Sequence, residues 1–531
     1  MSLTEIEYDK VNAFSNLLID YNLNNSHFSD LISNFPTLNN LNKQISFKSK
    51  NYNNQFRESL VKEIGNQYKG IKLSEIQKQN INKLLEKNTY TITTGHQLNL
   101  LTGPLYFIYK IISTINLSET LKKNYPEFDF VPIYWMASED HDFDEINNFS
   151  FQGSKFKWAS NQTGVVGEFK LDSIDNVLSE FEKFVSDFPY GNEIIKIFRE
   201  CYLNSNDLSN ATRKLVNILF AKYGLIIIDA NNKNLKFLFR DLIKKELNEK
   251  FIFNKSKKSI KRLNELKYNL QANPREINLF YIHDKKRERI IEKGNLFQTS
   301  NGSKKWNLEE IQDDVNLNPE KFSPNVLFRP IFQEFILPNI CYVGGPAEVA
   351  YWLELKSVFE SLNLTFPLIL NRNSALLLEK KQIDKLNKLN VSIEEIFLPK
   401  KQLKENLVRK YSKLKLDFTN LKQQLNNQFS ELKDKAIHTD KSFIGALNAQ
   451  EQKQINGLKM LEKRLLKSEQ RIHQDKINKV LEIRDKLFPG GKPQERISNF
   501  SEFYKIHGPN MIDKIKNNLV PLNQKFSIIE I

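Results

Sequence analysis

The sequence predicts an α/β protein in which a parallel sheet is followed by a long antiparallel helical hairpin. Three observations lead to this prediction. Short apolar runs of strand length alternate with segments of helical spacing, and glycine-containing turns follow several of these runs. Residues 400–487 repeat apolar side chains at intervals of three and four, with mostly polar residues between them.

The first 88 residues are expected to be helical, because apolar residues such as Leu60 and Ile64 recur three or four positions apart. Helices are also expected at 105–121 and 346–354, each opened by a Gly-Pro pair. Five strands are expected at residues 90–94, 130–136, 225–229, 339–343 and 366–370. Pro132 argues against a central place for the second strand, since proline cannot donate to the hydrogen-bond ladder.

Residues 400–487 are expected to form two long helices that pair as an antiparallel coiled coil roughly 50–60 Å long, at about 1.5 Å per residue. A break at 438–441 separates the helices, and the Pro-Gly-Gly turn after Phe488 ends the second one. One hairpin leaves apolar surface uncovered, so a homodimer is expected. The predicted seam consists of Leu403, Leu407, Tyr411, Leu414, Phe418, Leu421, Leu425, Phe429, Leu432 and Ala436, then Leu447, Ile455, Leu458, Leu461, Leu465, Ile472, Val480, Ile483 and Leu487.

Composition indicates a folded, soluble chain. The 531 residues include 40% hydrophobic and 27% charged residues, and the two cysteines exclude a disulfide scaffold. No apolar run reaches the length of a spanning helix, and residues 1–12 lack the pattern of a signal peptide, so we expect a cytoplasmic protein with no membrane partner. The net charge of +15 comes mostly from lysines scattered among asparagines, which favours a general lysine-rich composition over nucleic-acid binding and is compatible with anionic small molecules.

Four polar segments follow expected strand ends, where parallel sheets bind ligands. The first contains Gly95, His96 and Gln97, followed by Gly103 and Tyr106. Glycines let the backbone approach a ligand and the free N–H groups at a helix start attract anions, so this segment predicts a phosphate or carboxylate site. A tight strand-to-helix turn with a hydrogen-bonded His96 is the alternative.

The second segment places five carboxylates within the seven residues 139–145. A helix start explains Asp142 and Glu145, but Glu139 and Asp140 require something positive nearby. We therefore interpret Asp140 or Glu139 as binding or deprotonating an amino group, and we expect His141 to hold its proton more tightly than a free imidazole. No metal site is predicted, because neither His-x-x-x-His nor Cys-x-x-Cys occurs.

The third and fourth segments complete the predicted site. Gly344 and Gly345 form a backbone nest, and Glu348 in the next helical turn suits an amino group; Tyr351 and Trp352 can share its face. Capping and aromatic core packing are the alternative there. The fourth segment contains Arg372 and Ser374, and Arg329 likewise follows an apolar run. Their guanidinium groups match carboxylates or phosphates, or else form structural salt bridges.

Together these segments resemble the BshC family, the cysteine-adding enzymes of bacillithiol biosynthesis. Long matches occur in one order across nearly the whole chain. They are Thr94-Gly95-His96-Gln97, Thr102-Gly103-Pro104-Leu105-Tyr106, Pro132-Ile133-Tyr134-Trp135-Met136-Ala137-Ser138-Glu139-Asp140-His141-Asp142, Arg329-Pro330, Tyr342-Val343-Gly344-Gly345-Pro346-Ala347-Glu348-Val349-Ala350-Tyr351-Trp352 and Arg372-Asn373-Ser374-Ala375.

The resemblance implies a Rossmann-like core with connecting-peptide insertions and a coiled-coil domain that dimerises. The residue patterns divide the chain into a helical part of the core (1–88), the core itself (89–380, with insertions at about 150–325), the coiled coil (381–487) and a segment returning to the core (488–531). The resemblance also implies the last step of bacillithiol formation, in which a ligase joins L-cysteine to the amine of glucosaminyl-malate.

Site roles follow from combining the resemblance with the residues. Asp140, Glu139 or Glu348 would bind or deprotonate the amine, and His141 would transfer a proton or stabilise charge. Arg372, Lys110 and the loops at Gly95 and Gly103 would hold anions. The activating cofactor is not determined by the sequence; ATP or ADP is compatible, and Gly490, Gly491 and Lys492 are a second candidate nucleotide site.

Two other functions stay open at this stage. One is an RNA-binding, synthetase-like coiled-coil protein that catalyses nothing. The other is a nucleotidyltransferase that acts on a different small molecule. Mass spectrometry of a reaction with cysteine, glucosaminyl-malate and ATP separates them, because each function gives a different product or none.

Overall fold

The computed structural model describes residues 4–414, 416–437 and 441–531. The chain divides into two compact units. The first unit comprises Met1–Asp9, Ala13–Leu377 and Lys492–Ile531, and the second comprises Lys10–Asn12 and Leu378–Gly491.

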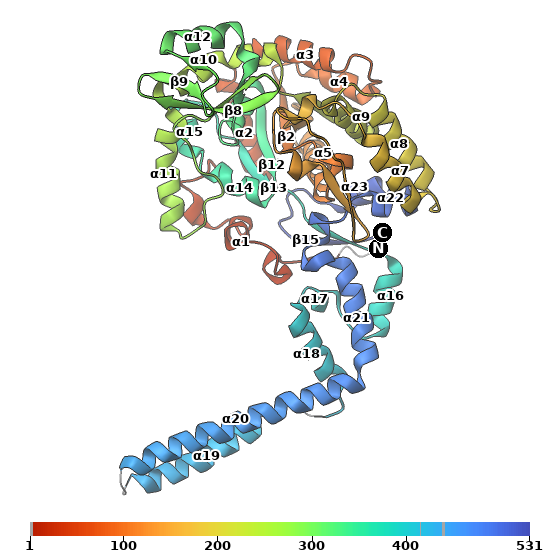
Figure 1. The fold of residues 1–531 in the computed structure, drawn as a ribbon, viewed down its shortest axis with the longest axis vertical. Helices are drawn as coiled ribbons and strands as arrows, with labels where there is room; N and C mark the ends of the chain where they lie inside the picture. The colour runs from red at the N-terminus through yellow and green to blue at the C-terminus, as the bar shows by residue number, and fades with distance from the viewer. Residues whose placement is uncertain (1–3, 415, 438–440) are drawn as a thin grey trace. The chain divides into compact units, whose positions relative to one another are not determined.

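A five-stranded parallel sheet forms the centre of the first unit (Figure 1). Its strands in spatial order are β13 (Leu368–Asn371), β12 (Asn339–Gly344), β2 (Thr89–His96), β3 (Asp129–Met136) and β6 (Ile226–Asp229). These are the five strands expected from the apolar runs, and the sheet confirms the predicted α/β class. Along the chain, the first strand of this sheet, β2, lies beside its fourth, β12, so the direction of winding reverses between them. That position is where ligands bind in sheets of this topology.

The expectation that Pro132 excludes a central strand is wrong. β3 lies between β2 and β6, and Pro132 is paired with Ile92 of β2. β6 begins opposite Ile133, one residue beyond the proline, so Pro132 has a paired residue on one side only. The missing N–H is therefore tolerated inside the sheet.

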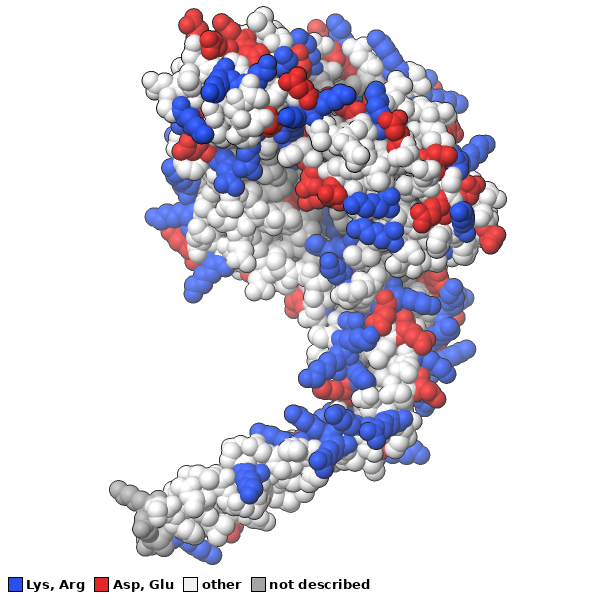
Figure 2. Space-filling view, viewed as in Figure 1, with Lys and Arg blue, Asp and Glu red and all other residues white. Residues whose placement is uncertain are grey.

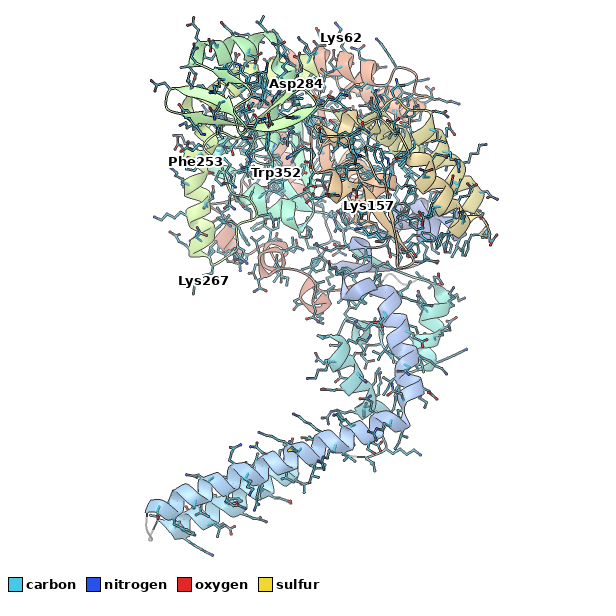
Figure 3. The ribbon with its side chains drawn as sticks, viewed as in Figure 1. Lys62, Lys157, Phe253, Lys267, Asp284 and Trp352 are labelled. Carbon is cyan, nitrogen blue, oxygen red and sulfur yellow. The ribbon has the colours of Figure 1, made fainter. Side chains whose placement is uncertain are left out.

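Helices and apolar contacts bury this sheet. All residues of β12 and all but the last of β2 are buried, as expected for a parallel sheet covered by helices. Trp352 is fully buried, whereas Lys62 and Lys267 lie at the periphery (Figure 3). The helices of this part are α1 (Asn16–Asn22), α2 (Leu38–Asn51), α3 (Phe56–Gln67), α4 (Glu75–Lys83), α5 (Tyr106–Asn124), α10 (Lys233–Glu249), α11 (Phe251–Glu265), α13 (Arg329–Ile336), α14 (Pro346–Leu353) and α15 (Lys356–Ser361).

The region from about 150 to 325 contains two insertions. The first consists of a hairpin and three helices, namely β4 (Asn148–Phe151), β5 (Ser154–Lys157), α7 (Ile174–Val185), α8 (Gly191–Leu203) and α9 (Leu208–Phe220). The short helix α6 (Phe143–Ile146) precedes it. The second is an antiparallel sheet with α12 (Leu308–Leu317), in the order β10 (Lys305–Trp306), β9 (Leu296–Thr299), β8 (Lys286–Lys293), β7 (Leu279–His283) and β11 (Phe322–Pro324).

The C-terminal segment belongs to the first unit. It forms α22 (Ser501–His507), α23 (Asn510–Asn518) and β15 (Phe526–Glu530). β15 pairs antiparallel with β1 (Thr4–Ile6) and completes a three-stranded sheet with β14 (Ala375–Leu378).

The second unit is helical. It consists of α16 (Lys380–Lys388), α17 (Ile393–Ile396), α18 (Lys400–Tyr411), α19 (Thr419–Ala436), α20 (Lys441–Ile472) and α21 (Gln474–Leu487). α19 and α20 lie side by side as a hairpin (Figure 1), and two ion pairs, Lys422–Glu462 and Lys433–Glu451, join them. Of the predicted break at 438–441, residues 438–440 lie outside the described part of the chain.

The first helix of the predicted coiled coil is not continuous. It ends at Tyr411, and α19 begins at Thr419. Ser412 Oγ accepts the backbone N–H of Leu414, and Asp417 Oδ1 accepts the N–H of Thr419. Such local bonds give the backbone an alternative to helix, which the three-and-four spacing of apolar residues does not reveal. Within the described ranges, no helix combines the length and apolar character needed to cross a membrane.

Candidate active site

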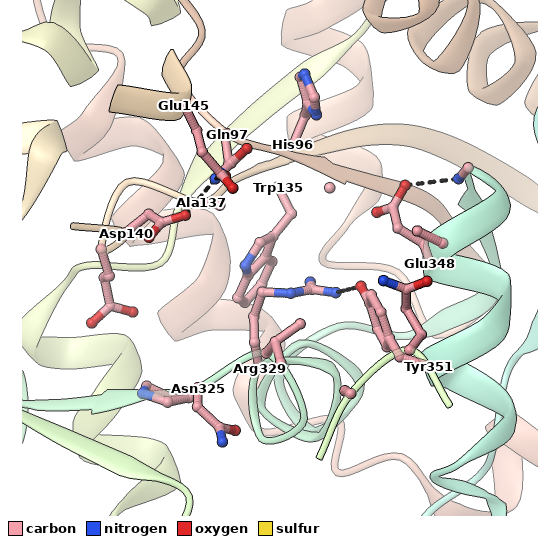
Figure 4. Close-up of a pocket in the computed structure, with 18 of the residues that line it drawn as sticks. His96, Gln97, Trp135, Ala137, Asp140, Glu145, Asn325, Arg329, Glu348 and Tyr351 are labelled. Atoms are coloured by element: carbon pink, nitrogen blue, oxygen red, sulfur yellow. Dashed lines mark hydrogen bonds between the residues drawn. The ribbon is translucent and has the colours of Figure 1, made fainter. Parts of the chain in front are cut away.

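A cavity of about 780 Å³ opens at the carboxyl ends of the parallel strands in the first unit. Its lining comes from the ends of β2, β3 and β12, from α5 and α14, and from the inserted strands β7 and β8 (Figure 4). Figure 2 shows this face hollowed, with red carboxylate and blue basic side chains beside the hollow. The cavity thus lies at the reversal point between β2 and β12, where the loops on either side diverge.

Glu348 in the first turn of α14 is held by three donors. Its carboxylate accepts the backbone N–H of Gly345 at 2.7 Å, the hydroxyl of Tyr342 at 2.5 Å and the ammonium of Lys110 at 2.5 Å. Lys110 also donates to the Gly95 carbonyl at the end of β2. Burial raises the pKa of Glu348, but Lys110 and the other donors outweigh it and hold that pKa below its usual range. Glu348 is therefore a fixed anion that positions Lys110.

Arg372 follows β13 and forms a buried, two-pronged ion pair with Glu495 from the C-terminal segment. Its Nη2 donates to Glu495 Oε1 at 2.8 Å and its Nη1 to Oε2 at 3.1 Å. Nη1 also donates to Ser374 Oγ. Nε of Arg372 is buried and has no partner in the described chain, and it lies 3.8 Å from where a Cβ on Gly345 would stand. Arg372 therefore has a free donor at the cavity beside the Gly345 backbone.

Arg329, the first residue of α13, occupies the same side of the cavity. It donates to Gln333 at 2.9 Å and to the hydroxyl of Tyr351 at 3.0 Å, and it lies over the ring of Tyr342. Its charge has no carboxylate within ion-pair distance among the residues described. Glu348 and Glu495 balance the charges of Lys110 and Arg372, so the unpaired charge of Arg329 leaves this side of the cavity net cationic.

His96 is the last residue of β2, and its ring packs against those of Tyr106 and Phe107. Burial, Lys110 and Arg372 lower its pKa well below the usual value, so the imidazole is neutral. Its Nε2 is buried and has no hydrogen-bond partner within the described ranges.

Asp140 and Glu145 form the acidic side. Both accept from one amide group, Gln97 Nε2, at 2.6 and 2.9 Å (Figure 4). Asp140 also accepts the backbone N–H of His141. Apart from the nearby imidazole of His141, no basic side chain of the described residues lies within ion-pair distance of either carboxylate. These two carboxylates can therefore accept an ammonium group.

Glu139 directly precedes Asp140 but, unlike Asp140, is paired with a lysine. Its carboxylate is bound by Lys236 of α10, whose side chain is completely buried and which also donates to the Glu320 carbonyl. Glu139 lines the cavity, but its charge is already balanced. It holds the acidic loop to α10.

The expectation that His141 binds its proton more tightly is wrong. Its Nδ1 lies 3.0 Å from Arg287 Nη1, and a guanidinium can only donate, so Nδ1 is the acceptor and carries no proton. Burial and Arg287 lower the pKa of His141 more than Asp140 and Asp142 raise it. The sequence shows the neighbouring carboxylates but not the arginine from an inserted strand.

The structure brings most of the predicted site residues into one cavity and leaves others outside. Those that line it are Gly95, His96, Gln97, Tyr106, Lys110, Glu139, Asp140, Arg329, Gly345, Glu348, Tyr351 and Arg372. Those that do not are Gly103, His141, Gly344, Trp352 and Ser374, together with Gly490, Gly491 and Lys492, which are exposed. Trp352 packs in the core, as the alternative reading of that segment expected.

Sequence reasoning missed five charged residues of the lining. Glu145 was explained as part of a helix start, and Arg275, Arg287, Arg289 and Arg496 lie far from the motifs at strand ends. Arg287 and Arg289 stand two residues apart in β8, a spacing that places both side chains on one face of a strand and could have drawn attention to them. The described residues contain no group of three or more His, Cys, Asp or Glu that could hold a metal ion.

Comparison with known families covers almost the whole chain. Residues 1–373 match the N-terminal Rossmann-like domain of the bacillithiol biosynthesis protein BshC, and residues 375–531 match its C-terminal coiled-coil domain. A relative from Flavobacterium johnsoniae is 46% identical over 526 residues, covering 99% of each chain. One from Christiangramia forsetii is 46% identical, covering 99% of this chain and 98% of its own. One from Bacillus cytotoxicus is 26% identical, covering 90% and 91%. All three carry the name "Putative cysteine ligase BshC".

Proposed function

The chain belongs to the BshC family of bacillithiol biosynthesis, and we propose that it is a carbon–nitrogen ligase that joins L-cysteine to the amine of glucosaminyl-malate. This reaction is the last step of bacillithiol formation. The observation that supports it most is the division of one cavity into a cationic side and an acidic side. Such a cavity suits the joining of a carboxylate and an ammonium.

The acidic side would receive the amine. An ammonium group has no lone pair and cannot attack a carboxyl carbon until it loses a proton. Asp140 and Glu145 can bind the ammonium together, because Gln97 orients both oxygens toward the same place. We assign Asp140 as the base, since it lines the cavity and is not neutralised by a lysine or arginine.

The cationic side would hold the carboxyl group of cysteine. A free carboxylate is a poor electrophile, so the proposal includes its activation by ATP: a carboxylate oxygen attacks a phosphorus of ATP, a phosphoanhydride bond breaks, and the mixed anhydride forms with release of ADP or pyrophosphate. The free Nε of Arg372, together with Arg329 and Lys110, fits the anionic oxygens of such a group. Asp140 first takes the proton that frees the amine and releases it to solvent. Attack by the amine then forms the amide bond, the second proton on nitrogen passes to Asp140, and the phosphate group leaves with the bonding electrons.

Two other carboxylates of the site, those of Glu348 and Glu139, are already bound by lysine side chains. Glu348 is bound by Lys110 and Tyr342 and has a lowered pKa, which makes it a weak base. Glu139 is bound by Lys236. We therefore reserve proton transfer for Asp140 and assign Glu348 the positioning of Lys110.

The test is Asp140→Asn with Asp142→Asn as the matched control. Asp142 caps α6 by accepting the N–H of Glu145, and asparagine caps equally well, so the control keeps the same local structure and the same change in charge. With cysteine, glucosaminyl-malate and ATP, mass spectrometry should show cysteinyl amide from the control and at least 100-fold less from Asp140→Asn. Wild-type turnover by a folded Asp140→Asn variant would disprove the assignment.

We further propose that the ligase is a homodimer paired through α19 and α20 and that it acts in the cytoplasm, where cysteine stays reduced. Exposed apolar side chains along the hairpin support the dimer; they are Leu421, Leu432, Phe443, Met460 and Leu461. Sedimentation velocity of the full chain tests it, and a monomer at micromolar concentration would contradict it.

A further inference from the structure

The inserted antiparallel sheet forms a separate wall of the cavity. Phe280 of β7 and Arg287 and Arg289 of β8 all line it. Arg287 and Arg289 are two residues apart in one strand, so their side chains leave the same face of the sheet. Their guanidinium carbons lie 3.9 and 5.7 Å from the centre of the Phe280 ring. One aromatic ring thus positions two guanidinium groups at the cavity.

The positive charge on this wall is not balanced by contact. Arg287 donates to Ser323 Oγ, the Pro324 carbonyl and His141, none of which is an anion. Arg289 is exposed, and its guanidinium has no hydrogen bond or ion pair among the residues the structure describes; the same holds for Arg275 on the loop before β7. Three arginines that face a cavity without a carboxylate partner indicate an anion-binding surface.

This wall adjoins the acidic side rather than the cationic side described above. Arg287 contacts His141, the residue next to Asp140, and its guanidinium interacts electrostatically with both Asp140 and Glu139. Lys110 and Arg372, by contrast, are joined to β2, β12 and the C-terminal segment. A molecule whose ammonium group binds Asp140 and Glu145 therefore extends toward the arginine wall.

We propose that Arg275, Arg287 and Arg289 form a dicarboxylate subsite for the anionic end of the amine substrate. This rests on the proposed function, in which the substrate carries an amine together with a malyl group. Two guanidinium forks on one strand suit two separate carboxylates, one fork for each. Arg287 is fixed by its three bonds, while Arg289 and Arg275 are free to bind. A phosphate group is the competing anion, and the experiment distinguishes it.

The experiment measures binding to the full-length protein by calorimetry, with L-malate and inorganic pyrophosphate as separate probes. The variants are Arg289→Gln and Arg275→Gln, and Lys286→Gln is the matched control. Lys286 lies on the same strand, loses the same charge, is exposed and does not line the cavity. All three side chains are exposed, so the melting temperatures should equal that of the wild type.

We expect L-malate to bind at least ten-fold more weakly to Arg289→Gln and Arg275→Gln than to wild type, and equally well to Lys286→Gln. In turnover, KM for glucosaminyl-malate should rise while KM for cysteine stays unchanged. The proposal is overturned if wild type does not bind malate, if both arginine variants bind it normally, or if they weaken pyrophosphate binding only. Malate binding does not require turnover. If the ligase assay gives no product while the variants change malate affinity as expected, the proposed function is refuted and the anion subsite is still supported.

Discussion

Replacing Lys110 by methionine should be one of the most destabilising single changes in the site. The Lys110 side chain is 3% exposed, that of Glu348 is 20% exposed, and their charged atoms are 2.5 Å apart. Methionine fills most of the lysine stem, so the main change is that Glu348 keeps its charge without its cation. Removing one partner of a buried pair typically costs about 3–5 kcal/mol of unfolding free energy. We expect a loss of this size at neutral pH.

The pH dependence and a second substitution identify the cause. In the wild type the pKa of Glu348 is lowered, so the pair stabilises the fold above the ordinary carboxyl pKa and loses that contribution as the pH falls below it. Without Lys110, burial raises the pKa of Glu348, and the unpaired charge disappears as it protonates. The difference in unfolding free energy between the wild type and Lys110→Met should therefore become smaller at acid pH.

Urea unfolding followed by circular dichroism measures both effects. Adding Glu348→Gln to Lys110→Met should restore at least about 2 kcal/mol relative to the sum of the single changes, because residues in direct contact couple. If the two changes are additive within about 0.5 kcal/mol, or if the loss is the same at pH 4 and pH 8, the pair does not stabilise the site as described.

Two further changes test other features of the first unit. Gly345→Ala adds a Cβ 3.4 Å from Glu348 Oε2 and 3.8 Å from Arg372 Nε, which are ordinary contacts, so the melting temperature should stay within about 2 °C of wild type. The new methyl group would occupy the space beside Arg372 where the cysteine carboxyl group is proposed to bind, so the KM for cysteine should rise at least ten-fold. Gly65→Ala in α3, with nothing within 4 Å, is its control and should leave KM unchanged; equal KM values for both variants would contradict a ligand at Gly345. Burial raises the pKa of Glu246 to about 7. Between about pH 4.5 and 7 the folded state therefore keeps a proton that the unfolded chain loses, so the unfolding free energy should fall by up to roughly 3 kcal/mol as the pH rises through this range. Urea unfolding at pH 5 and pH 8 measures this fall in unfolding free energy, which should be smaller in Glu246→Gln than in the wild type. An equal fall in both proteins would contradict the prediction.

Much of the fold could be predicted because the relevant signals are local. Apolar runs, Gly-Pro turns and helical spacing predicted the five parallel strands and the helices that follow β2 and β12. The carboxyl ends of parallel strands meet at one edge, which is why residues such as Gly95, Asp140 and Glu348 could be expected near each other. The break between α18 and α19 was missed because it depends on two side-chain bonds to the backbone.

The state and partner of each charged side chain depended on contacts across the chain. Arg372 pairs with Glu495 more than a hundred residues away, and Glu139 pairs with Lys236. Burial, together with Arg287 from an inserted strand, reverses the pKa shift expected for His141. The sequence by itself determined the strands, their parallel arrangement and the types of group at their carboxyl ends, because strand and turn preferences act over a few residues. Only the tertiary structure decided which carboxylates remain unpaired and which arginines face the cavity, because electrostatic interactions depend on distance in space and on burial.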